Sequence, residues 1–133
     1  MVLVVDDERD AQEMIASVLT HCDALVTASS STAEALDRIR TAEPHIVVAD
    51  IGMPGEDGYT LIRKLRALDA GRYADTPAIA LTAYARAEDA ARARAAGFDL
   101  HLAKPVEPAT LVQSVPGLGN FTLESVDLQA CVI

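Results

Sequence analysis

The stretch from His45 to Gly58 reads His-Ile-Val-Val-Ala-Asp-Ile-Gly-Met-Pro-Gly-Glu-Asp-Gly, and it decides the fold. Its first half is an aliphatic run that ends at Asp50, which is typical of a strand buried on both faces of a sheet. Its second half contains Gly52, Pro54 and Gly55, residues that favour a loop. A buried strand that runs into such a loop through a carboxylate indicates a parallel sheet with a site at its carboxyl edge.

The same pattern recurs on both sides of this stretch. Aliphatic runs predict further strands over residues 2–5, 24–27, 78–81 and 99–103, and helical periodicity or composition predicts helices over 8–20, 31–39, 59–68, 87–96 and 108–115. Ser31 has the spacing to Glu34 of a helix-capping box. A strand followed by a helix, five times over, predicts an α/β protein with a doubly wound five-stranded parallel sheet covered by helices on both faces.

Chemically notable residues follow four of these strands. Asp6 and Asp7 end the first, Asp50 the third, Thr82 the fourth, and Lys104 the fifth. Because the carboxyl ends of parallel strands meet at one edge, we expect these side chains to lie together. Each residue alone has a simpler explanation, such as a helix cap for the aspartates or a solvated charge for the lysine. Their joint placement favours a site.

Three crowded carboxylates repel one another unless a cation joins them, and hard oxygen ligands suit Mg²⁺. A metal ion, an ammonium group and a hydroxyl around one further carboxylate make a phosphoryl-transfer site. The carboxylate would then be the nucleophile and would form an aspartyl phosphate.

The blocks 2–8, 47–58, 80–84 and 104–105 resemble the signature blocks of response-regulator receiver domains, in order and each at a strand end. The resemblance covers residues 1–115 and implies a flavodoxin-like (βα)5 fold with strand order 2-1-3-4-5. It also implies phosphorelay signalling, with a phosphoryl group taken from a histidine kinase or a histidine phosphotransfer protein. Such a domain assists its own phosphorylation and dephosphorylation but is not otherwise an enzyme.

The resemblance assigns a role to each matching residue. Asp50 is the phosphoacceptor, and Mg²⁺ is held by Asp6, Asp7, Asp50 and the backbone carbonyl of Gly52. Thr82 is the switch hydroxyl, and Lys104 pairs first with the acceptor carboxylate and then with phosphate. Pro105 follows the lysine, through a cis peptide bond in the family, and would fix the lysine's direction.

Three positions depart from the family pattern or modulate it. His101 stands where the family commonly has Tyr or Phe as a second switch residue, and a partly exposed structural histidine is the competing interpretation. Gly52 and Tyr84 occupy two places that influence how fast the phosphoryl group is lost to water. Gly52 would leave one side of the site open, whereas Tyr84 could overhang the other or lie on the surface.

Composition limits the partners. The 133 residues carry a formal net charge of −9, which argues against direct binding to nucleic acid or to an anionic membrane surface. Cys22 and Cys131 lie too far apart in the sequence for a metal site or a disulfide framework. We interpret them as reduced thiols and expect a cytoplasmic, bacterial protein.

Several alternatives remain open at this point. The chain could be a degenerate receiver that acts only as a protein-interaction module, or a small-ligand enzyme on a flavodoxin-like sheet. The intact acidic residues argue against the degenerate receiver. The acidic loop after the first strand argues against the small-ligand enzyme. The domain could be a stand-alone regulator or the receiver of a hybrid sensor kinase.

Residues 116–133 have no clear period and are expected to form a tail, disordered or packed on the body. The alanine-rich helix over 87–96 is expected to be loosely anchored, because small side chains bury little area.

Overall fold

The computed structural model describes residues 1–83, 87–104 and 106–114. Five strands and five α-helices alternate along this part of the chain. The strands are β1 (Val2–Val5), β2 (Val26–Ser29), β3 (Ile46–Asp50), β4 (Ala78–Thr82) and β5 (Leu100–Ala103). The helices are α1 (Arg9–His21), α2 (Thr32–Ala42), α3 (Gly58–Ala67), α4 (Ala87–Ala96) and α5 (Pro108–Ser114).

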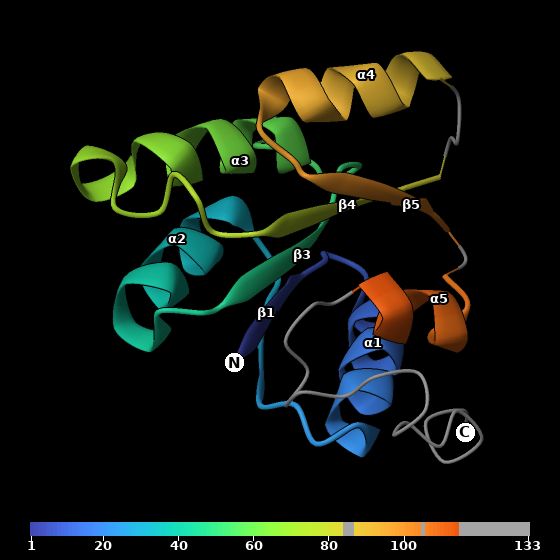
Figure 1. Cartoon of the computed structure of the whole chain (residues 1–133). Coiled ribbons are helices and arrows are strands. Elements are labelled where there is room, and N and C mark those ends of the chain that lie inside the picture. Colours follow the sequence, from blue (N-terminus) through green and yellow to red (C-terminus); the bar gives the residue numbers. More distant parts are fainter. Residues whose placement is uncertain (84–86, 105, 115–133) are drawn as a thin grey trace.

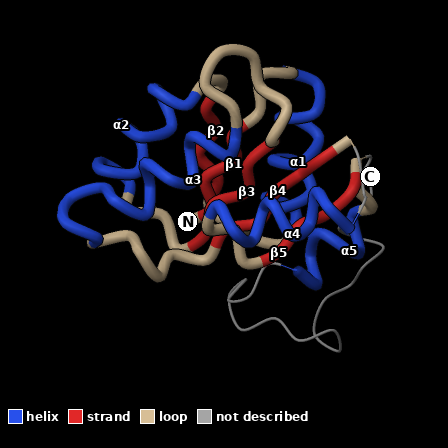
Figure 2. Tube along the Cα trace, turned by 90° about the horizontal axis from the view of Figure 1, so that it is seen from above, coloured by secondary structure: helices blue, strands red, loops and turns tan. Residues whose placement is uncertain are grey.

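All five strands are parallel and lie in the order β2-β1-β3-β4-β5, which confirms the predicted doubly wound sheet. Figure 1 labels β1, β3, β4 and β5, and Figure 2 labels β2 as well. The register aligns the strand ends: Val5 lies opposite Ala49, Asp50 opposite Leu81, and Thr82 opposite Ala103. Parallel pairing in this register brings the functional residues that follow β1, β3, β4 and β5 to one edge.

Helices lie on both faces of the sheet (Figure 2), and a separate hydrophobic core lies on each face. Leu3 and Val5 of β1 point to the face covered by α2, α3 and α4, whereas Val2 and Val4 point to the face covered by α1 and α5. This alternation follows from the two-residue period of a strand. The central strands are buried on both faces, which explains their unbroken aliphatic sequence.

The second strand begins two residues later than the sequence predicts. Strand β2 spans Val26–Ser29, not 24–27, because the chain after α1 first turns at Asp23, whose φ is 65°. Leu25 is left exposed, although its carbonyl accepts a hydrogen bond from the amide of Val2. A second unpredicted feature is the 3₁₀ segment η1 (Leu68–Gly71), in which Asp69 and Ala70 have positive φ.

The helix caps follow the sequence more closely. The Ser31 side chain accepts a hydrogen bond from the amide of Glu34, so the predicted cap of α2 is present. Asp57 caps α3 in the same way, through the amide of Thr60.

Cys22 is buried and is not a free thiol, which contradicts the expectation of a reduced cysteine, and Cys131 lies outside the described residues. None of the helices over residues 1–83, 87–104 and 106–114 is long and apolar enough to cross a membrane.

Candidate metal centre and adjoining pocket

Strand ends bring Asp6, Asp50, Thr82 and Lys104 together at the carboxyl edge of the sheet, as predicted. Asp6 follows β1, Asp50 and Thr82 are the last residues of β3 and β4, and Lys104 follows β5. The amide of Lys104 donates to the carbonyl of Thr82 at 2.8 Å, so the lysine backbone continues the β4–β5 ladder by one more pair. The lysine side chain therefore starts from a fixed point beside β4.

Asp6 is the most deeply placed of these carboxylates, with no exposed surface. Its Oδ1 accepts from the amide of Glu8 at 2.9 Å. The side-chain amide of Gln12 holds the same strand end, because it donates to the carbonyls of Asp6 and Ser29 at 3.1 and 2.9 Å. These bonds tie the ends of β1 and β2 together and fix where the Asp6 carboxylate points.

Asp6, Asp7 and Asp50 form a cluster that could hold a metal ion. One carboxylate oxygen from each lies within 4.8 Å of the others. Asp6 and Asp50 are buried, and Asp7 is exposed. An all-oxygen set with one side open to solvent fits a hard divalent ion that keeps part of its water, such as Mg²⁺. The residues present therefore fit the metal that the sequence predicts.

Lys104 lies between two of these carboxylates and pairs more closely with Asp6 than with Asp50. Its Nζ is 2.8 Å from Oδ2 of Asp6 and 3.4 Å from Oδ2 of Asp50. Burial acts to lower the pKa of Lys104, but the hydrogen bond to Asp6 and the charges of both carboxylates outweigh it and raise the pKa. The lysine is therefore a permanent cation at neutral pH, placed to neutralise charge next to Asp50.

The pKa of Asp50 is raised, mainly because burial removes water from its carboxylate. The amide of Gly52, which donates to Oδ1 at 3.1 Å, and the charge of Lys104 act in the opposite direction, and the charge of Asp6 adds to the rise. The environment of the Asp50 carboxylate therefore favours the binding of a cation beside it or the neutralisation of its negative charge.

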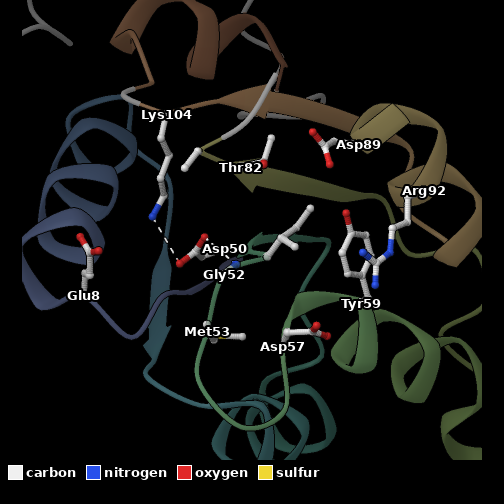
Figure 3. A pocket seen from close by; sticks show the side chains of 12 residues that line it. Glu8, Asp50, Gly52, Met53, Asp57, Tyr59, Thr82, Asp89, Arg92 and Lys104 are labelled. Atoms are coloured by element: carbon white, nitrogen blue, oxygen red, sulfur yellow. Dashed lines mark hydrogen bonds and ion pairs between the residues drawn. The ribbon is translucent and has the colours of Figure 1, made fainter. Parts of the chain in front are cut away.

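Asp50 and Thr82 open into a pocket of about 450 Å³ (Figure 3). The side chain of Lys104 reaches toward Asp50 from one side, and Tyr59 with Arg92 lies on the opposite side. Glu8, Gly52, Met53, Asp57 and Asp89 complete the labelled lining. The pocket is large enough for a phosphoryl group and part of a donor on the open side of Asp50.

For four of the predicted residues, the assigned role stays a prediction. His101 is half-buried on β5, and its Nε2 is buried without a hydrogen-bond partner among the described residues. The roles assigned to Tyr84 and Pro105 lie outside the described residues. The role of the Gly52 carbonyl as a metal ligand stays a prediction, although its amide already contacts Asp50.

Sequence reasoning missed the residue that sets the loop after β3. A Cβ on Gly58 would lie 2.7 Å from the carbonyl oxygen of Asp50 and from Cα of Ile51. The Gly58 amide also donates to the carbonyl of Ile51 at 3.0 Å. In the sequence this glycine only ends the stretch that predicts a loop, whereas the structure needs it for close backbone approach. Gln12, Tyr59 and Arg92 were also missed, because their contacts join residues remote in sequence.

A family model described as "Response regulator receiver domain" matches residues 2–116. The chain belongs to the response regulator receiver domain family. An uncharacterized 14.6 kDa protein of Leptolyngbya boryana is 41% identical over 114 residues, which cover 86% of each chain. The chemotaxis response regulator CheY4 of Vibrio cholerae has the same fold, with a TM-score of 0.78 and 28% identity over 84% of this chain and 92% of that one.

Receiver domains also occur within longer proteins. "Probable histidine kinase 2" of Oryza sativa subsp. indica is 32% identical in an alignment 131 positions long, which covers 88% of this chain but only 12% of the kinase. The site described above would have the same residues in a stand-alone regulator and in a hybrid kinase.

Proposed function

We propose that this receiver domain takes a phosphoryl group onto Asp50 and passes the signal on through a changed protein-interaction surface. The observation that carries the proposal is the position of the Asp50 carboxylate, which opens into the pocket with Lys104 at 3.4 Å and two further carboxylates within 4.8 Å. This set supplies a nucleophile, a fixed cation and oxygen ligands for a metal ion at one point.

In the proposed reaction an oxygen of Asp50 attacks the phosphorus of the donor. The new P–O bond forms as the bond from phosphorus to the donor breaks, and the electron pair of that bond leaves with the donor. Lys104 neutralises charge on the transferred group, and the Thr82 hydroxyl donates a hydrogen bond to one of its oxygens. Mg²⁺ held by Asp6, Asp7, Asp50 and the Gly52 carbonyl would offset the charge that develops on the phosphoryl oxygens.

The donor in this proposal is a histidine kinase or a histidine phosphotransfer protein, and the output partner is another protein. Similarity to histidine kinases of Oryza sativa and to a hybrid kinase of Dictyostelium discoideum supports a kinase as the source. The net charge of −9 supports a protein partner over nucleic acid or an anionic membrane. In this proposal the functional unit is residues 1–115 and the location is cytoplasmic, whereas the expected tail 116–133 lies outside the described residues.

The test is incubation with acetyl phosphate, with and without Mg²⁺, followed by intact mass. We expect a Mg²⁺-dependent gain of one phosphoryl group that is labile to base. The gain should be lost in Asp50→Asn and kept in Asp89→Asn, which removes a carboxylate from the same pocket but not from the metal cluster. A folded wild-type protein that is never modified would support the interaction-module alternative instead.

A further inference from the structure

One turn of α4 forms the side of the pocket that faces Lys104. Asp89 and Arg92 both line the pocket, and they are three residues apart on α4. Residues at that spacing share one face of a helix, so the first two turns of α4 present this face to the pocket that contains Asp50. Figure 3 shows the Arg92 guanidinium against the ring of Tyr59 at this wall.

Helix α4 has very little apolar anchoring. Ala93 is its only buried residue, so a single methyl group is its main contribution to the core. Arg92 supplies a second attachment, because its guanidinium carbon lies 4.2 Å from the centroid of the Tyr59 ring, within the range of a cation–π interaction. The ring is a fixed platform, since Tyr59 is buried in the first turn of α3.

The other end of α4 is held separately. The Arg66 side chain of α3 donates to the carbonyl of Gly97 at 3.1 and 2.8 Å and to the carbonyl of Tyr73 at 2.9 Å. Gly97 directly follows the last residue of α4. The C-terminal end therefore keeps its attachment whatever happens at Arg92. The stack on Tyr59 specifically holds the part of α4 that borders the pocket.

We infer that Arg92 is a positioning residue that limits the access of water to phosphorylated Asp50. This inference rests on the proposed function. In hydrolysis, a water oxygen forms a new bond to phosphorus, and the P–O bond to Asp50 breaks with its electron pair returning to the carboxylate. The protons of that water stay on inorganic phosphate or pass to solvent. Water reaches the phosphorus through the pocket, so the position of α4 sets how readily it arrives.

The experiment compares the lifetime of the aspartyl phosphate in wild type, Arg92→Ala, Arg92→Lys and Arg94→Ala. Proteins are phosphorylated with acetyl phosphate and Mg²⁺, exchanged into buffer with Mg²⁺, and followed by intact mass. Arg94 is the matched control, because it is exposed on the same helix and does not line the pocket. Arg92→Lys keeps the charge but loses the planar stacking group.

We expect Arg92→Ala to shorten the lifetime roughly two- to fivefold, the range that corresponds to one exposed cation–π contact. Arg92→Lys should fall between it and wild type, and Arg94→Ala should match wild type. Mg²⁺ affinity should stay unchanged, because Asp6, Asp7 and Asp50 keep their places. Amide hydrogen exchange in the N-terminal half of α4 should speed up in Arg92→Ala alone, which a uniform loss of stability would not produce.

Equal lifetimes in Arg92→Ala and Arg94→Ala, with normal phosphorylation, would overturn this inference and leave the proposed function standing. Lifetimes that shorten equally in both variants would also overturn it, because α4 would then act through general stability. Failure of every protein, wild type included, to take up a phosphoryl group would overturn the proposed function, and this inference with it.

Discussion

Helices α3 and α4 are both ten residues long and cover the same face of the sheet, yet they are held in place by different means (Figures 1 and 2). Helix α3 buries Tyr59, Leu61, Ile62 and Leu65 against the sheet. Helix α4 buries only Ala93 and relies on arginine contacts with α3. Apolar burial fixes α3 firmly, whereas α4 depends on polar contacts at its middle and just beyond its C-terminal end.

The difference matters because each helix borders the pocket. Helix α3 begins at Gly58, directly after the loop that positions Asp50, so any movement of α3 would displace the site itself. Helix α4 contributes Asp89 and Arg92 to the wall without carrying the cluster of carboxylates. A change of charge on Asp50 can therefore be accommodated by α4 while α3 and the site stay in place. Segments with few buried contacts are the ones that move at low cost.

The strongest test of whether α3 is held more firmly than α4 is to truncate the best-buried side chain of each helix. Leu65→Ala should lower the free energy of unfolding by about 2–5 kcal/mol, because it leaves a cavity in a fully buried position. Ala93→Gly should cost only about 1 kcal/mol, mostly through helix propensity. Urea denaturation at neutral pH measures both. Equal losses would mean that α4 is as firmly anchored as α3.

A second test concerns the start of α3. Gly58→Ala should destabilise the domain by about 1–3 kcal/mol, since its Cβ would meet backbone atoms of Asp50 and Ile51 at 2.7 Å. It should also lower phosphoryl uptake, because relief of that clash moves the acceptor loop. Gly52→Ala is the control, because its Cβ would meet nothing closer than Oδ1 of Asp50 at 3.8 Å. Comparable unfolding midpoints for the two variants would show that the loop adjusts freely.

A third test uses the charge of Asp50 itself. Burial raises the pKa of Asp50 above the ordinary 3.8, so the folded protein binds this proton more tightly than the unfolded chain does. The resulting gain in stability is fully present below pH 3.8 and is lost as the pH rises through the raised pKa. Asp50→Asn stays neutral, and Lys104 keeps its closer partner Asp6 at 2.8 Å. Without Mg²⁺, we therefore expect the variant to have the higher urea midpoint at neutral pH, with the advantage shrinking toward acid.

Added Mg²⁺ should narrow that difference, because binding to the native cluster stabilises the wild-type protein more than a variant with one ligand changed. Identical midpoints for the two proteins at neutral pH without Mg²⁺ would mean that the buried charge of Asp50 is already fully compensated. The urea midpoints without and with Mg²⁺ thus separate the destabilisation caused by the buried Asp50 charge from the stabilisation caused by bound Mg²⁺.

Much of this arrangement was predictable from the sequence, because it depends on local pattern. Continuous aliphatic runs predicted β1, β3 and β4, and the residue after each run identified Asp6, Asp50 and Thr82 as residues of one site. The start of β2 was placed two residues early, since a half-buried edge strand has a weak apolar signal and the turn at Asp23 depends on backbone geometry. Caps such as Ser31 were predictable because their bonds span three residues.

Contacts between distant segments were not predictable in the same way. Nothing near Gln12 in the sequence indicates that it joins the ends of β1 and β2, and nothing near Arg92 indicates a stack on Tyr59. Lys104 pairs with the acceptor carboxylate, as expected, at 3.4 Å, but its Nζ lies closer to the fully buried Asp6, at 2.8 Å. Tertiary geometry, and not residue type, decides these pairings.

The smallest expected effect, and the one that sharpens the comparison most, concerns His101 on β5, the strand against which α4 packs. Its Nε2 is buried without a partner among the described residues, so His101→Phe removes an unpaired polar atom and should change stability by no more than about 1 kcal/mol. If His101 is a second switch residue, the variant should take up as much phosphoryl group as wild type. It should differ, however, in how far beryllofluoride with Mg²⁺ alters hydrogen exchange in α4. His21→Phe, on the exposed end of α1, serves as the control. An unchanged response of α4 in His101→Phe would leave this histidine as a structural residue and assign the coupling between Asp50 and α4 to the pocket wall.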